Sequence, residues 1–142
     1  MEWFVCVLFL LITCLLIFIS WQDILLRIIS NKSLIALLFI VIPLMLIQYR
    51  VPNIAAALVI ILCFFPLFIC NVIGGGDVKL MAILALSLTW SQLIDFLLLT
   101  SFIGCGIGII GLVLFRQVTK ERGLPYGVAI SLAYIAYYSL YY

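Results

Sequence analysis

Apolar residues fill six segments of this chain, and short polar breaks separate them. The segments lie near residues 3–20, 34–47, 54–73, 78–90, 93–115 and 124–142 of the 142-residue sequence. A helix that crosses a bilayer needs about 20 mostly apolar residues. The pattern therefore predicts an all-α fold, a polytopic membrane helix bundle with about six transmembrane helices. Little length remains for a second domain, so we expect residues 1–142 to form a single transmembrane domain.

Composition supports a membrane location. Hydrophobic residues make up 69% of the chain and charged residues only 8%, which is typical of integral membrane proteins. The first apolar segment has neither a basic start nor a small-residue cleavage site, so we expect a retained helix and not a signal peptide. The expected location is the cell membrane, with several passes through the lipid bilayer.

The basic residues predict an orientation. If successive polar breaks alternate between the two sides of the membrane, Arg50 falls alone on one side and six basic residues share the other: Arg27, Lys32, Lys79, Arg116, Lys120 and Arg122. The positive-inside rule makes the second side cytoplasmic and places both termini outside. Aromatic residues that prefer interfaces agree, since the same topology places Trp3, Tyr49, Trp90 and the terminal YYSLYY at the outer boundary.

One polar stretch, GGGDVKL at 74–80, is unexpected in such an apolar chain. If Trp90 lies at the outer interface, the helix back to Val78 covers only about 20 Å of a hydrocarbon layer about 30 Å thick. Asp77 would then lie inside the membrane, where a carboxylate costs several kcal/mol unless it has a partner, water or a proton. We expect Gly74, Gly75 and Gly76 to release the backbone from helical geometry and to allow another chain to approach. The alternatives are a plain helix break and an ion pair of Asp77 with Lys79.

Topology selects a partner for Asp77. Two apolar segments separate it from Asp23, so both carboxylates face the same side, whereas Asp95 belongs to the opposite face. Two close carboxylates share a proton, which leaves one as a general base toward water and the other as a general acid toward a carbonyl. The pattern thus favours aspartic-protease chemistry. The alternative for Asp23 is an ion pair with Arg27, four residues later on a helix.

Other catalytic chemistries find little support. The sequence has no histidine, which excludes serine–histidine and cysteine–histidine mechanisms. Its five cysteines lie inside apolar segments without metal-site spacing, and we interpret them as small apolar packing residues. We expect no metal, no cofactor and no nucleic-acid partner.

Three motifs in order resemble those of the type IV prepilin peptidases, which are intramembrane aspartic proteases with a GxGD signature. They are DILLRIISN at 23–31, GGGDVKL at 74–80 and LPYGVAI at 124–130. The resemblance is greatest to the short, peptidase-only form of tight-adherence pilus systems. It implies that Asp23 and Asp77 are catalytic. It also assigns substrate-binding or site-shaping positions to Gly74, Gly75, Gly76, Lys79, Arg27, Asn31, Pro125, Tyr126 and Gly127.

The resemblance implies an endopeptidase that removes the short basic leader from prepilin-like (Flp-type) membrane precursors at the cytoplasmic boundary. Two departures qualify it. Ser30 stands where the family often has proline, and the first cytoplasmic break lacks the cysteine-bearing region of longer relatives, so we expect no N-methyltransferase activity. Pro125 could also simply start the last helix. The alternative functions are a membrane subunit that relays ions or protons through the aspartates, and an inactive assembly partner.

Small residues recur along one face of the fifth segment, at Ser101, Gly104, Gly108 and Gly111. Such spacing lets two membrane helices approach closely. We expect this face to pack inside the bundle, with self-association as the alternative.

Overall fold

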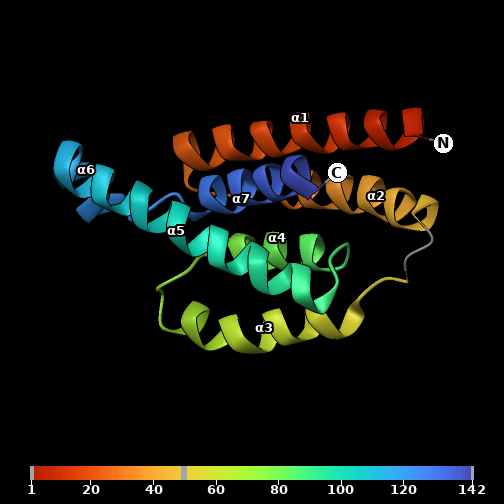
Figure 1. Cartoon of the computed structure of the whole chain (residues 1–142). Helices are drawn as coiled ribbons and strands as arrows, with labels where there is room; N and C mark the ends of the chain where they lie inside the picture. Colours follow the sequence, from red (N-terminus) through yellow and green to blue (C-terminus); the bar gives the residue numbers. More distant parts are fainter. Residues whose placement is uncertain (1, 49–50, 142) are drawn as a thin grey trace.

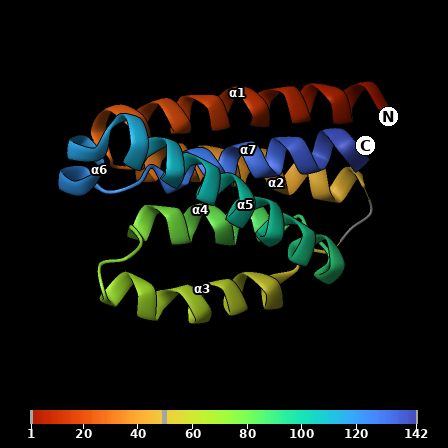
Figure 2. The same cartoon turned by 60° about the vertical axis from the view of Figure 1, so that its left-hand side comes forward.

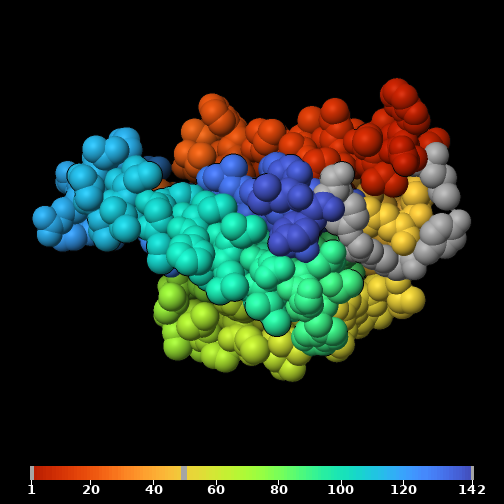
Figure 3. Space-filling model, in the orientation of Figure 1, coloured from red at the N-terminus to blue at the C-terminus, as the bar shows by residue number. Residues whose placement is uncertain are grey.

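The computed structural model describes residues 2–48 and 51–141, and within these ranges the chain is all-α with seven helices. They are α1 (Glu2–Leu26), α2 (Asn31–Ile47), α3 (Ile54–Ile69), α4 (Gly75–Ala85), α5 (Trp90–Leu114), α6 (Arg116–Arg122) and α7 (Tyr126–Tyr141). Six of them overlap the predicted apolar segments, but α4 ends at Ala85, and Trp90, which the pattern predicts to end the fourth segment, begins α5. The additional helix, α6, forms in the polar break predicted after the fifth apolar segment. It protrudes from one end of the bundle (Figure 3).

Successive long helices run in opposite directions, so the two ends of the described chain lie at the same end of the bundle (Figures 1 and 2). Helix α7 lies in the middle and packs against α1, α4 and α5. Helix α3 packs on α4 at the periphery, and α2 joins α1 to α4. This arrangement brings the end of α1 and the starts of α4 and α7 together at the end where α6 protrudes.

Polar caps fix several helix ends. Ser30 begins α2, where its hydroxyl accepts a hydrogen bond from the Lys32 backbone N–H (3.3 Å). Asn53 begins α3, and its side-chain amide also donates to the Leu88 carbonyl (3.1 Å), which ties this end of α3 to the turn after α4. Thr89 begins α5 with a complete capping box. Ser30 therefore caps the start of α2. The family that the sequence resembles often has proline at this position.

Large side chains from α5 and α7 fill the core. Phe96, Tyr134 and Tyr137 are among the largest fully buried side chains. Tyr137 and Tyr138 of the terminal aromatic run are buried within the bundle, and the placement of this run at the outer boundary stays a prediction. Trp3 and Trp90 are exposed. Tyr49, Arg50 and Tyr142, which entered the orientation argument, lie outside the described residues.

The outer surface of the bundle is strongly apolar, with exposed leucine, isoleucine and phenylalanine side chains on most helices. Helices α1 and α5 are long and apolar enough to cross a membrane, while α2 and α3 are shorter apolar helices. These features are those of a membrane protein. The full six-span arrangement and the sides occupied by the termini stay predictions.

Two packing expectations have different outcomes. All five cysteines are free and exposed, so the interpretation of them as interior packing residues is wrong. The small-residue face of α5 does lie against other parts of the chain. A Cβ at Gly104 would lie 3.8 Å from the Ala129 Cβ, and one at Gly111 would lie 3.0 Å from the Thr119 hydroxyl. Part of this face therefore packs internally, at Gly108 and Gly111, while Ser101 is exposed and Gly104 and Gly108 also border an apolar cavity.

Candidate active site

Asp23 lies in the last turn of α1, and its side chain is only 5% exposed. A carboxylate at the C-terminal end of a helix opposes the helix dipole, so helix stability does not explain its position. The N-terminus of α7 compensates, because the Gly127 backbone N–H donates a hydrogen bond to Asp23 Oδ2 (2.9 Å). This contact joins residues 104 positions apart in the sequence.

Asp77 lies in the first turn of α4 and is 7% exposed. A negative charge is favourable there because the helix dipole is positive at its N-terminus. Its Oδ1 atom is nevertheless buried without a hydrogen-bond partner. Unsatisfied buried carboxylate oxygens are costly, so this atom is suited to bind a water molecule or a substrate group.

The two carboxylates line the same cavities. One cavity, of about 270 Å³, contains Asp23 and Asp77 together with Arg27, Arg122 and Tyr126. A second, of about 200 Å³, also contains both aspartates. The structure therefore brings together the two carboxylates that topology had paired, from helices more than 50 residues apart in the sequence.

Neither alternative ion pair forms in the described part of the chain. Helix α1 ends at Leu26, and Arg27 adopts a left-handed backbone conformation (φ 55°), so it does not continue the helical face of Asp23, although its side chain lines the same cavities as that carboxylate. The Arg27 guanidinium Nη1 donates to the Gly123 carbonyl (2.8 Å). Lys79 Nζ donates to Asn31 Oδ1 (3.4 Å) and not to Asp77. The carboxylates are thus left available to each other and to the cavity.

The glycines of the GGGD motif act through close approach and not through backbone freedom. Gly74 has an extended backbone (φ −71°, ψ 146°), but Gly75 and Gly76 are helical, so the expectation that they release the backbone from helical geometry is wrong for these two. A Cβ at Gly76 would lie 2.9 Å from the Ile29 Cβ, and one at Gly75 would lie 3.1 Å from the Phe68 ring. Gly74 precedes the helix, and a Cβ there would lie 3.3 Å from Asp77 Oδ2. The motif therefore lets α4 pack against the segment after α1.

The motif at the start of α7 contributes in the same way. A Cβ at Gly127 would lie 2.9 Å from Asp23 Oδ2 and 3.2 Å from Ile29 Cδ1, so only glycine fits without a shift. Tyr126 lines the larger carboxylate cavity. Pro125 precedes α7, and its carbonyl accepts a hydrogen bond from the Val128 N–H (3.2 Å) in the first turn.

Two predicted site residues, Lys79 and Asn31, lie elsewhere. They line a separate, mostly apolar cavity between α2, α3 and α4. Lys79 follows Asp77 by two residues on a helix, a rotation of about 200° at 3.6 residues per turn, so its side chain leaves α4 on the other side. The structure does not place these two residues with the carboxylates.

Sequence reasoning missed several cavity residues, among them Phe68, Asn71, Gly123 and Leu124. Gly123 carries a detectable signal, since glycine with positive φ (78°) commonly follows a helix end. Asn71 also has positive φ (56°), which asparagine tolerates. Leu124 opens the LPYGVAI motif, from which the resemblance assigns only residues 125–127 to the site, and Phe68 gives no signal because it is one apolar residue among many.

Metal binding finds no support in the side chains. Within residues 2–48 and 51–141, no group of three or more His, Cys, Asp or Glu side chains lies close enough to hold a metal ion. The chemistry available to the cavity is that of two carboxylates, with the Arg27 and Arg122 side chains at its boundary.

A family model for the type IV leader peptidase family matches residues 10–109. The chain therefore belongs to this family of peptidases. Both Asp23 and Asp77 lie within the matched region, whereas the Gly127 contact lies beyond it. No curated protein and no solved structure gives a significant match to the chain.

Proposed function

We propose that this protein is a membrane-embedded aspartic endopeptidase that removes the short basic leader from prepilin-like (Flp-type) precursors. Asp23 and Asp77 would be its catalytic pair. The observation that carries the proposal is the shared cavity, which two buried carboxylates from α1 and α4 line and in which the Asp77 Oδ1 atom has no hydrogen-bond partner. Membership in the leader peptidase family supports the same reaction.

The proposed mechanism uses one shared proton. One carboxylate takes a proton from water as the water oxygen attacks the scissile carbonyl carbon. The other carboxylate gives its proton to the carbonyl oxygen. The tetrahedral intermediate then collapses. The C–N bond breaks as the first carboxylate gives the leaving nitrogen the proton it took from water, and the second carboxylate takes back a proton from a hydroxyl of the intermediate, which restores the carbonyl and the shared proton. The Gly127 N–H would hold Asp23 in position throughout.

We place the site at the cytoplasmic boundary of the membrane. The carboxylates lie at the same end of the bundle as the basic helix α6, and Arg122 of that helix lines their cavity. Cytoplasmic segments are enriched in lysine and arginine. A precursor whose leader lies in the cytoplasm and whose apolar segment lies in the bilayer would present its cleavage point at this level.

Leader removal from a precursor reconstituted with the protein in lipid vesicles tests this proposal. The readout is the mass of the new N-terminus, which also reports whether a methyl group is added; we expect none. Native protein should release the leader, and Asp77→Asn should not. Asp95→Asn is the matched control, since this carboxylate sits in the first two turns of α5 and does not line the cavity. Equal cleavage by native protein and Asp77→Asn would refute the proposal.

Proton relay is a second candidate, favoured by one observation. Helix α7 carries a row of buried polar side chains beyond Gly127, at Ser131, Tyr134 and Tyr138. The Tyr134 hydroxyl lies 2.8 Å from the Ser87 hydroxyl. If the aspartates feed such a relay, vesicles containing the protein should show a proton flux that Tyr134→Phe lowers. Under the peptidase proposal, this variant cleaves the precursor normally and no such flux exists.

A further inference from the structure

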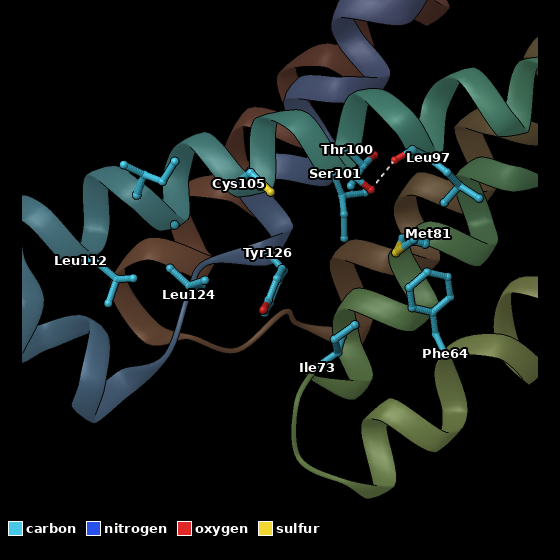
Figure 4. Close-up of a pocket in the computed structure, with 14 residues that line it drawn as sticks. Phe64, Ile73, Met81, Leu97, Thr100, Ser101, Cys105, Leu112, Leu124 and Tyr126 are labelled. Atoms are coloured by element: carbon cyan, nitrogen blue, oxygen red, sulfur yellow. Dashed lines mark hydrogen bonds between the residues drawn. The ribbon is translucent and has the colours of Figure 1, made fainter.

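An apolar groove of about 530 Å³ adjoins the carboxylate cavity. Helices α3 and α4 form one side, and α5 and the start of α7 form the other (Figure 4). Helix α5 contributes the longest wall, with Leu97, Ser101, Gly104, Cys105, Gly108 and Leu112. The volume is within the range of about 300–1,000 Å³ that is usual for binding sites.

The groove is continuous with the candidate active site. Ile73, Leu124 and Tyr126 line both the groove and the larger carboxylate cavity. The Tyr126 side chain extends from the start of α7 into the space between α5 and α4 (Figure 4). A ligand in the groove can therefore extend past Tyr126 to Asp77, whose buried Oδ1 has no hydrogen-bond partner.

The groove has the length and chemistry of a site for a helix. Its wall on α5 runs over 16 residues, from Leu97 to Leu112, which is about 22 Å or four helical turns. Gly104 and Gly108 carry no side chain to fill it, while Ser101 and Cys105 are exposed along it. Polar groups surround the carboxylates, whereas apolar side chains line most of the groove.

We infer that this groove binds the apolar helical segment that follows the scissile bond of the substrate. The inference rests on the proposed peptidase function. A substrate segment in the bilayer must reach the carboxylates sideways from the lipid, and the groove provides an apolar path that ends at them. Side chains at every third or fourth position of the segment would enter the groove, as in other helix-in-groove complexes. A lipid acyl chain is the competing occupant.

Cysteine cross-linking tests this contact with residues that the chain already has. Cys105 lies in the groove, and Cys14 is an exposed cysteine on α1 that does not line it. Two Asp77→Asn proteins, each retaining only one of these cysteines, would be mixed in vesicles with precursors that carry a single cysteine at successive positions of the apolar segment. Oxidation with copper phenanthroline should join Cys105 to precursor positions that repeat every three or four residues. Cys14 should give only background adducts.

Filling the groove supplies a second measurement. Cys105→Phe should raise the KM for the full precursor about tenfold. Gly106→Phe, at the neighbouring position, is the control and should leave the KM unchanged, because a Cβ at Gly106 meets nothing within 4 Å. A short peptide that contains the leader and cleavage point without the apolar segment should be cleaved slowly, and equally by native protein and Cys105→Phe.

The outcomes separate the two proposals. In one outcome, native protein and Cys105→Phe cleave the precursor equally, and Cys105 gives no more adduct than Cys14. The groove is then a lipid site and this inference is wrong, while the peptidase proposal stands. If native protein does not cleave the precursor at all, both proposals fail. Periodic adducts through Cys105 with a raised KM in Cys105→Phe support the inference.

Discussion

Replacement of Gly127 by alanine should disable the protein without unfolding it. The Gly127 N–H donates to Asp23 Oδ2 at 2.9 Å, and an added Cβ would lie 2.9 Å from the same oxygen. Protein Cβ atoms essentially never approach another atom this closely. Asp23 must therefore turn away from α7, and the hydrogen bond must lengthen or break.

The size of the effect follows from the lost contact. A hydrogen bond to a charged group contributes about 1.5–3 kcal/mol, and each 1.36 kcal/mol lost from transition-state stabilisation lowers a rate about tenfold. We therefore expect Gly127→Ala to lower kcat for precursor cleavage by about 10- to 100-fold. Because Asp23 is buried, loss of this hydrogen bond should also lower the free energy of unfolding by about 1.5–3 kcal/mol, so the variant should still fold but unfold at a lower temperature.

Precursor cleavage in vesicles measures the rate, and thermal unfolding in detergent measures the stability. Gly106→Ala is the matched control, since it adds the same methyl group to a helix where nothing lies within 4 Å. A Gly127→Ala protein that cleaves at the native rate would show that the position of Asp23 against α7 is irrelevant to catalysis. A fall in kcat and in the unfolding temperature for folded Gly127→Ala, with both values native in Gly106→Ala, supports the reasoning.

Three further predictions concern the frame around the carboxylates. Gly76→Ala should lower cleavage and thermal stability because its Cβ meets Ile29 at 2.9 Å, and the second change Ile29→Ala should restore part of both. Arg27→Met removes the hydrogen bond to the loop before α7 and should slow cleavage about tenfold, by loss of a charged hydrogen bond; an unchanged rate would mean that this loop needs no such support. Ser87→Ala removes the contact with the Tyr134 hydroxyl and should cost about 1 kcal/mol in unfolding free energy, with cleavage unchanged; an unchanged unfolding free energy would mean that this hydroxyl pair does not stabilise the fold.

The hydropathy pattern predicts the main helices well, because each needs a long apolar run. It does not predict α6, whose residues Arg116–Arg122 are mostly polar and read as a loop. It also misplaces the start of α4, since glycine suggests a break where the helix in fact begins at Gly75. Helix propensity does not explain a glycine that stands in a helix because another segment packs closely against it.

The pairing of Asp23 with Asp77 could be predicted from the sequence, because counting apolar segments decides which acidic residues face the same side. The contacts that frame the pair could not. Ile29 is one isoleucine among many, yet it lies against both Gly76 and Gly127. Lys79 follows the motif in sequence but leaves its helix on another side. Which residues face the carboxylates depends on the rotation of each helix about its own axis. Apolar residues surround these helices so evenly that the hydropathy pattern does not determine this rotation.

Single and double substitution of the two aspartates tests the central proposal most directly. Cleavage rates would be compared for native protein, Asp23→Asn, Asp77→Asn and the double variant at equal abundance in vesicles. Groups that act as one catalytic unit are strongly non-additive, so each single change should lower kcat at least about 1,000-fold and the double change should lower it no further. Cleavage by either single variant at near the native rate would contradict the account, because the pair would then not be the catalytic centre.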